Sequence, residues 1–261
     1  MKNDIYGKNM IMEEIIKNYG AYVYNYAWKL TCHPQQAEDL AQETFIQAWK
    51  HMEQLKEEVA LKKWLRTICY HQFLMNCRKK DEHLIYVEDM TLLEQDGDML
   101  TAYENIPEEA VLVNETVREL QNGCFYAMVR RLTLSQRIAF SLVDMFGMTT
   151  KEAAELLEVS NGALKGLLYR ARMNLDSFFA EHCNLLHSEN PCSCEEWIAF
   201  RENHEKNKQQ MRNMVQTIDY RQKGYLFDEK VRGKISYLYS HMPEKRPRDE
   251  WFQRVIAALE D

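Results

Sequence analysis

The sequence predicts an all-α protein with two small helical domains, an acidic linker between them and a helical C-terminal extension. Apolar residues recur at helical spacing through most of the chain. Nine glycines and five prolines among 261 residues are too few for a β protein with many turns. Acidic residues gather in one stretch between the two helical regions. We therefore predict domains over residues 10–80 and 123–180, a linker over 81–122 and an extension over 181–261.

The first domain is predicted to contain three helices. Apolar spacing indicates a helix over Met12–Thr31, and Pro34 breaks the pattern. The run "AEDLAQETFIQAWKHM" resumes it, and one face of this run carries Ala37, Leu40, Ala41, Thr44, Phe45 and Ala48. A polar connector over Glu53–Ala60 leads to a third helix, "LKKWLRTICYHQFLMNCRKK". The apolar stripe of this third helix is expected to leave Tyr70 and His71 on the opposite face.

Charge is divided unevenly along the chain, whose formal net charge is −7. Residues 81–122 carry a net charge of −11, whereas residues 1–80 carry +3 and residues 123–180 carry +2. Residues 181–261 carry −1. We interpret the acidic stretch as a solvated tether that runs into a helix near Glu108 and whose charge would repel DNA. The mildly basic segments on either side leave nucleic-acid binding open.

Four helices are predicted in the second domain. The runs "FYAMVRRL" and "TLSQRIAFSLVDMFG" form the first two. The runs "TTKEAAELLE" and "NGALKGLLYRARMNLDSFF" follow, with a corner between them that is typical of a helix-turn-helix. Thr149 and Glu152 have the spacing of a capping box, and Ser160 is the predicted N-cap of the last helix.

The two helices of this motif need a shared core and an exposed reading face. The residues spaced to form the shared core are Ala153, Ala154, Leu157, Val159, Leu164 and Leu167. The polar residues expected to point outward are Asn161, Lys165, Tyr169 and Arg172, with Arg170 beside them. Cations and hydrogen-bonding side chains on an exposed helix suit phosphates and base edges. An ordinary amphipathic helix with a solvated face is the alternative interpretation.

The seven cysteines are an odd number without secretory context, which favours reduced thiols over a disulfide framework. The candidate ligands for zinc or copper(I) in the extension are Cys183, His187, Cys192 and Cys194. The Cys-x-Cys spacing differs from that of a zinc knuckle. A redox-responsive thiol cluster and a simple group of reduced cysteines therefore stay open as alternatives. The helical patterns that follow, with Trp197, Phe200, Tyr237, Tyr239, Trp251 and Phe252, suit packing on the other domains or on a protein partner.

Several function classes are disfavoured. The sequence has no P-loop, hydrolytic triad or paired-carboxylate arrangement, so we predict a protein that is not an enzyme and requires no cofactor. No apolar run approaches the length of a membrane span, so no membrane insertion is expected. Acidic residues interrupt the opening stretch "MKNDIYGKNMIMEEIIKNYG", where a signal peptide needs an apolar core. A cytoplasmic location is the default expectation.

Two stretches resemble one known family. The run "LTLSQRIAFSLVDMFGMTTKEAAELLEVSNGALKGLLYRARMNL" resembles region four of the extracytoplasmic-function (ECF) sigma factors of bacterial RNA polymerase. The runs "AEDLAQETFIQAWKHM" and "LKKWLRTICYHQFLMNCRKK" resemble region two of the same family. The two resemblances occur in the family's order and cover most of residues 10–180. They imply a subunit that binds core RNA polymerase and directs promoter-specific transcription initiation.

The resemblance also implies roles for particular residues. Region four would read the −35 element with the helix from Asn161 to Arg172, and Arg137 would contact phosphate. Region two would bind the polymerase clamp and open the −10 element. Asp39, Gln42 and Glu43 match the family's clamp-binding surface, although a solvated face fits their periodicity equally well. The cations and ring expected to hold single-stranded DNA are Lys62, Lys63, Arg66 and His71. The implied partners are core RNA polymerase, promoter DNA and an anti-sigma factor.

The sequence departs from the family at the helix-turn-helix. Glu158 stands where the corner usually has glycine, and a positive φ at this residue would cost about 1 kcal/mol. Gly166 and Leu167 replace a more polar pair, and glycine weakens a helix by roughly 1 kcal/mol relative to alanine. We therefore expect weak DNA binding by this domain alone. The alternative functions are a stand-alone helix-turn-helix regulator and a metal- or redox-sensing protein in which DNA binding is secondary.

Overall fold

The computed structural model describes residues 2–55, 58–79, 93–94, 96, 100, 108, 110, 115–194 and 226–259. Every regular element within these residues is helical, which confirms the all-α prediction, and one isolated backbone bridge joins Cys183 to Cys192. No helix among them has the length and apolar character needed to cross a membrane. The chain forms two compact units, residues 1–84 with 243–261 and residues 85–242. The helix predicted near Glu108 and those predicted within residues 195–225 lie largely outside the described residues.

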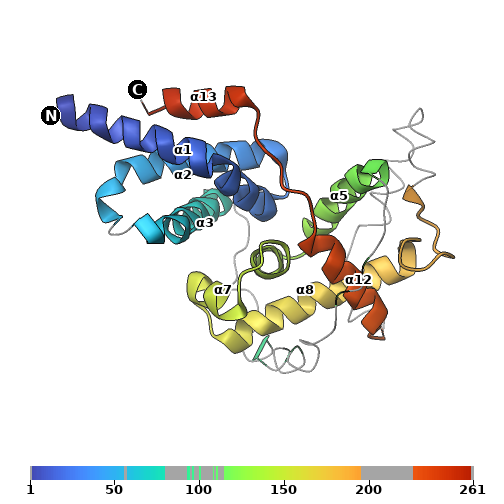
Figure 1. The fold of residues 1–261 in the computed structure, drawn as a ribbon. Helices are drawn as coiled ribbons and strands as arrows, with labels where there is room; N and C mark the ends of the chain where they lie inside the picture. The colour runs from blue at the N-terminus through green and yellow to red at the C-terminus, as the bar shows by residue number, and fades with distance from the viewer. Residues whose placement is uncertain are drawn as a thin grey trace. The chain divides into compact units, whose positions relative to one another are not determined.

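The first unit is built on the three predicted helices, which pack side by side (Figure 1). They are α1 (Lys2–Thr31), α2 (Pro34–Lys50) and α3 (Leu61–Lys79). Two 3₁₀ turns, η1 (Met52–Gln54) and η2 (Glu58–Ala60), lie in the connector. The predicted apolar face of α2 is buried along its whole length. This buried stripe gives α2 one apolar side and leaves its other side polar.

One side-chain expectation in this unit is wrong. Tyr70 was expected on the outer face of α3, but it is buried with a relative exposure of 2%, whereas His71 is exposed. Along α3 the buried positions run from Leu61 through Leu65 and Cys69 and then include Tyr70 and Phe73. The stripe therefore widens toward the end of α3, because α1 and α2 cover it on two sides.

The last helix, α13 (Asp249–Ala257), belongs to the first unit and packs on α1 and α2 (Figure 1). Trp251 is buried, and its indole N–H donates to the carbonyl oxygen of Glu38 over 3.3 Å. The guanidinium of Arg254 donates to the Glu38 carboxylate over 2.9 Å. Gly20 of α1 has no room for a Cβ, which would overlap with the ring of Phe252. Helix α13 is thus the fourth helix that packs in the first unit, within the residues that the structure describes.

The second unit contains α5 (Glu115–Val129), α6 (Leu134–Phe140), α7 (Thr150–Leu157), α8 (Asn161–His182) and α12 (Glu229–Ser240). The helix predicted over residues 133–147 begins as α6 and ends in a π-helical turn, η4 (Ser141–Met145). Within it the Phe146 N–H donates to the carbonyl oxygen of Ser141, five residues earlier. This wider turn places Asp144 beside α8.

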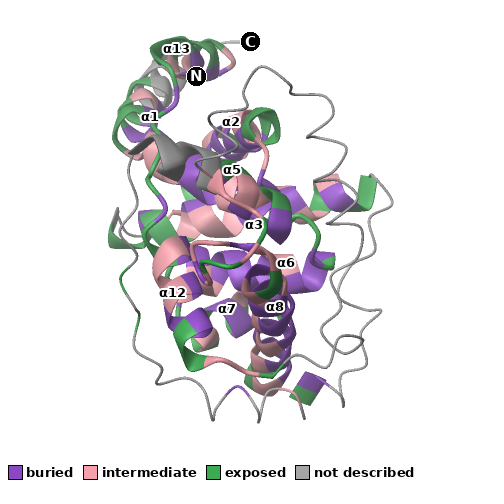
Figure 2. Ribbon diagram, turned by 90° about the vertical axis from the view of Figure 1, so that its right-hand side faces the viewer, coloured by how far each residue is buried: buried purple, intermediate pink, exposed green. Residues whose placement is uncertain are grey.

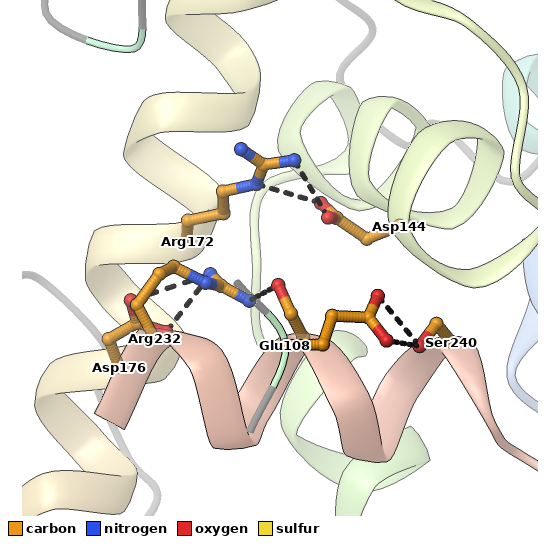
Figure 3. Close-up of polar contacts among 7 residues, drawn as sticks. Glu108, Asp144, Arg172, Asp176, Arg232 and Ser240 are labelled. Atoms are coloured by element: carbon orange, nitrogen blue, oxygen red, sulfur yellow. Dashed lines mark hydrogen bonds and ion pairs between the residues drawn. The ribbon is translucent and has the colours of Figure 1, made fainter. Parts of the chain in front are cut away.

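Helix α12 packs on α8 and η4 (Figures 1 and 3). Tyr239 of α12 is fully buried, and its ring centroid lies 4.8 Å from that of Phe125 and 4.9 Å from that of Phe140. The expected packing of aromatic residues of the extension on the other domains is therefore confirmed at Tyr239 and Trp251. Trp197 and Phe200 lie outside the described residues.

Candidate nucleic-acid interface

Helices α7 and α8 form the predicted helix-turn-helix. The hydroxyl of Thr149 accepts from the Glu152 N–H over 3.2 Å, and the Glu152 carboxylate accepts from the Thr149 N–H over 3.0 Å. This capping box and the Ser160 cap, which accepts from the Ala163 N–H over 3.0 Å, confirm both predicted helix starts. The Thr149 and Ser160 hydroxyls thus accept from N–H groups of the first helical turn that have no partner inside the helix.

The corner between the helices is strained at Glu158. Glu158 has φ 56° and ψ 39°, which is the left-handed conformation that glycine adopts without cost. Beneath the corner Ala153, Ala154, Leu157, Leu164 and Leu167 are buried, whereas Val159 is half-buried. Figure 2 shows the buried residues continuing along α8. The shared core thus fixes the direction of α8 relative to α7.

The reading face of α8 differs from the prediction at its arginines. Asn161 is exposed, and Lys165 and Tyr169 are half-buried. Arg170 is buried, and its Nε donates to the carboxylate of Asp96, a residue of the acidic stretch. Arg172 binds both oxygens of Asp144 at 2.8 and 3.1 Å (Figure 3). The expectation that Arg170 and Arg172 project outward is wrong, because each guanidinium is held by a carboxylate from elsewhere in the unit.

The far half of α8 is anchored by a buried ion pair with α12. Arg232 Nη1 lies 3.1 Å from a carboxylate oxygen of Asp176, and both side chains are almost completely buried (Figure 3). Burial raises the pKa of Asp176 to about 6, although the charges of Arg232 and Arg172 act in the opposite direction. Loss of hydration therefore outweighs the attraction between the two groups. The pair fixes α12 on α8 at a position that residue periodicity does not reveal.

Arg137 lies on α6 and is half-buried. Beside it, the side-chain amide of Asn174 on α8 donates to Gln136 over 3.1 Å in a buried contact. This hydrogen bond links α6 to α8, so the backbone of Arg137 has a fixed position relative to the helix-turn-helix. Its phosphate contact stays a prediction.

The acidic face predicted on α2 is accessible. Asp39 is exposed and accepts from the side-chain amide of Gln35 over 3.2 Å. Glu43 is half-buried and accepts from Gln47 over 2.8 Å, and Gln42 is half-buried. Because these residues lie on the side of α2 opposite its apolar stripe, they are available to a protein partner.

The cations predicted to hold single-stranded DNA lie on α3. Lys62 and Lys63 are exposed, and the Lys62 Nζ lies 5.5 Å from the ring centroid of Tyr22. Burial raises the pKa of Tyr22, and the charge of the half-buried Arg66 acts in the opposite direction. His71 is exposed and lies five residues beyond Arg66 in α3. Residues 56–57 of the connector lie outside the described residues.

The comparison with known families decides between these interpretations. The family model for Sigma-70 region 2 matches residues 15–83, and the model for Sigma-70 region 4 matches residues 122–175. Relatives named ECF RNA polymerase sigma factors match the chain over 170 and 175 residues. The chain belongs to the ECF sigma factors. A stand-alone helix-turn-helix regulator is not favoured, because this sigma factor carries both regions in the family's order.

The relatives of this sigma factor are distant. It is 26% identical over 170 residues to SigE of Mycolicibacterium smegmatis, a match that covers 65% of this chain and 62% of that protein. It is 26% identical to YlaC of Bacillus subtilis over 63% of this chain and 89% of that protein. It is 25% identical to SigM of Bacillus subtilis over 67% of this chain and 99% of that protein. No solved structure matches the chain significantly.

The cysteines of the sigma factor form a larger cluster than predicted. Cys183 and Cys192 are joined by the backbone bridge, and Cys183 is buried. Burial first, and then the neighbouring thiols Cys192, Cys183 and Cys194, raise the pKa of Cys124 on α5. Thiols of raised pKa are poor nucleophiles and poor metal ligands. No group of three His, Cys, Asp or Glu side chains within the described parts of the chain is arranged to hold a metal ion.

Sequence reasoning missed the charged partners of three α8 residues, Arg170, Arg172 and Asp176. Asp96 binds Arg170, Asp144 binds Arg172 and Asp176 binds Arg232. Asp96 and Arg232 come from segments far from α8 in the sequence, so no helical spacing predicts their contacts. The one available signal was the excess of acid between residues 81 and 122, which we interpreted only as a solvated tether.

Proposed function

We propose that the two matched regions of this sigma factor divide promoter recognition between them. Residues 123–180 bind duplex DNA at the −35 element, and residues 10–80 bind core RNA polymerase and the −10 element. The observation that supports this division is the capped helix-turn-helix, in a chain that also carries an accessible acidic helix face in region two.

On the DNA side, the proposed base and phosphate contacts come from α8 and α6. Asn161, Lys165 and Tyr169 are the contacts from the accessible part of α8. Arg137 contributes a phosphate contact, and Arg170 and Arg172 contribute theirs only after they exchange their carboxylate partners for phosphate. Such an exchange replaces one charge-assisted hydrogen bond by another.

On the polymerase side, Asp39, Gln42 and Glu43 are the proposed clamp contacts. Lys62, Lys63, Arg66 and His71 are the proposed contacts to the separated −10 strand. Exposed cations near an aromatic surface suit single-stranded DNA, because the cations follow the backbone while rings stack on bases. Flipping a base out of the stack costs a few kcal/mol, which these contacts must offset.

Run-off transcription with core RNA polymerase tests the division of roles. We expect Asp39→Ala to lose binding to the core enzyme, whereas Lys165→Ala keeps core binding and loses promoter selection. Glu14→Ala and Lys230→Ala are matched controls, since they remove an exposed charge of the same sign in the same unit. Equal core binding by Asp39→Ala and the native chain would contradict the clamp assignment. Unchanged promoter selection by Lys165→Ala would contradict the α8 assignment.

The remaining roles belong to the same proposal. We place the protein in the cytoplasm with core polymerase, assign it no catalytic activity and expect regulation by an anti-sigma factor. Zinc or copper binding at Cys183, His187, Cys192 and Cys194 stays a prediction, as does a redox response of these thiols. Metal analysis of protein purified under reducing conditions tests the site. About one metal ion per chain, lost in a Cys183→Ser and Cys192→Ser double variant, would support it.

A further inference from the structure

The start of α8 is covered by part of the acidic stretch. We call Leu93, Glu94 and Asp96 the acidic contact segment. Leu93 has no exposed surface, although the stretch around it is strongly acidic. An isolated tether would leave such a residue in water, so its burial indicates a docked position.

Gly166 makes this docking possible. A Cβ at Gly166 would overlap with the carbonyl oxygen and carbonyl carbon of Leu93, so the two backbones meet at a distance that only glycine allows. One turn earlier, a Cβ at Gly162 would lie 3.3 Å from Cγ of Glu94. The glycine that appeared to weaken the recognition helix therefore serves a close approach between the helix and the acidic contact segment.

Two polar contacts fix the segment at both ends of this surface. The hydroxyl of Ser160 donates to Oε1 of Glu94 over 2.7 Å, and Arg170 Nε donates to the carboxylate of Asp96. The Arg170 side chain is only 10% exposed. A hydroxyl at a helix start and an arginine are groups that bind phosphate in protein–DNA complexes. The two carboxylates occupy positions where phosphate oxygens would bind.

We propose that the acidic contact segment is an intramolecular ligand of the α8 surface formed by Ser160, Gly162, Gly166 and Arg170, and that it competes with DNA for this surface. This inference rests on the proposed function, in which α8 reads duplex DNA. DNA binds only the fraction of molecules in which the segment has left α8. The apparent affinity for DNA is therefore reduced by that fraction.

Proteolysis tests the docking without DNA. Glutamyl endopeptidase cleaves after glutamate, and a docked Glu94 is protected in the full-length chain. Gly166→Ala removes the space that Leu93 occupies, so the segment should stay undocked in this variant. If the segment is undocked about one-tenth of the time in the native chain, cleavage after Glu94 should be about tenfold faster in the variant. Gly123→Ala is the matched control, because Gly123 lies in α5 with open space around its Cα. Equal cleavage rates in Gly166→Ala and the native chain would overturn the docking.

Fluorescence anisotropy with a short duplex of mixed sequence at low ionic strength tests the competition. Asp96→Asn leaves α8 unchanged, and we expect the dissociation constant to fall by about tenfold if one-tenth of the native molecules are open. Glu189→Gln is the control, since it removes an exposed negative charge from the same unit. If Asp96→Asn and Glu189→Gln increase the affinity for the duplex equally, the increase comes from the change in net charge alone, and the proposed competition is wrong.

A third variant separates the two proposals. Lys165→Ala should weaken binding of the same duplex whether or not the segment docks. If Lys165→Ala weakens binding while Asp96→Asn leaves it at the native value, the competition is wrong and the DNA-binding role of α8 stands. If Lys165→Ala and Asp96→Asn both bind as the native chain does, the DNA-binding role of α8 fails, and the competition fails with it.

Discussion

Single residues of this sigma factor carry strain or buried charge that the rest of the unit must offset. Glu158 has a positive φ at the corner of the helix-turn-helix, and Asp176 is a fully buried carboxyl. Each arises from a requirement of the surrounding fold. The corner must turn within a few residues, and α12 must be fixed on α8 by Arg232.

Replacing Glu158 by glycine should stabilise the second unit. A side chain in the left-handed region costs about 1 kcal/mol relative to glycine, so Glu158→Gly should raise the free energy of unfolding by up to about that amount. Urea denaturation followed by circular dichroism measures it. Glu155→Gly inside α7 is the opposite control and should lose about 1 kcal/mol. A loss of stability in both variants would contradict the assigned corner geometry.

The buried carboxyl of Asp176 should make stability depend on pH. Its pKa is about 6 in the folded chain and 3.8 ordinarily, so the native state binds the proton more tightly than the unfolded state. The free energy of unfolding therefore falls as pH rises from about 4 to about 6. The expected loss is on the order of 3 kcal/mol. Comparing Asp176→Asn with the native chain in urea at several pH values isolates this contribution, since the asparagine does not titrate.

Removing Arg232 should leave Asp176 as an unpaired buried charge. We expect Arg232→Met to lose about 3 kcal/mol of unfolding free energy near pH 7.5. The loss should be smaller near pH 5, because the isolated carboxyl then takes up a proton at little cost. Equal losses at the two pH values would contradict the assigned ion pair. Lys234→Met on the less buried side of α12 is the control and should be nearly neutral.

At the scale of elements, apolar periodicity predicted the helices well and predicted contacts between distant segments poorly. The positions of α2, α3, α7 and α8 follow from spacing and caps within each run. The contact between Leu93 and Gly166 has no such signal, because the two residues lie in segments far apart in the sequence. Gly166 looked like a defect in α8 for the same reason: its partner is a backbone atom elsewhere in the chain.

Helix α13 gives the same lesson and its own prediction. The sequence predicted a mostly helical extension whose aromatic residues pack on the other domains or on a partner, but it did not predict α1 and α2 as the helices that α13 contacts. Trp251→Ala should destabilise the first unit by about 3–5 kcal/mol, since a buried tryptophan leaves a large cavity. Urea denaturation followed by tryptophan fluorescence, to which Trp28, Trp49 and Trp64 of the first unit contribute, measures this change. Gln253→Ala, at an exposed position of the same helix, should change it by less than about 0.5 kcal/mol.

For the whole molecule, the two units carry different parts of the proposed function and are stabilised differently. The first unit has a core of three long helices closed by α13, and its proposed polymerase face lies on the opposite side of α2 from its apolar stripe. In the second unit, carboxylates hold Arg170 and Arg172 of α8, and Asp176 of α8 holds Arg232 of α12. The proposed regulation through charge acts on the second unit, whereas the stability of the first unit depends mainly on apolar packing.

Because residues 243–261 return to the N-terminal unit, the polypeptide passes between the units twice, and one break in it does not divide the protein. A protease site inserted between residues 84 and 85 should yield two fragments that still elute together under native conditions, held by the docked C-terminal helix. The same cut in a Trp251→Ala chain should release them as separate species. Helix α13 would therefore keep the two fragments bound to each other after a single cut in the acidic stretch.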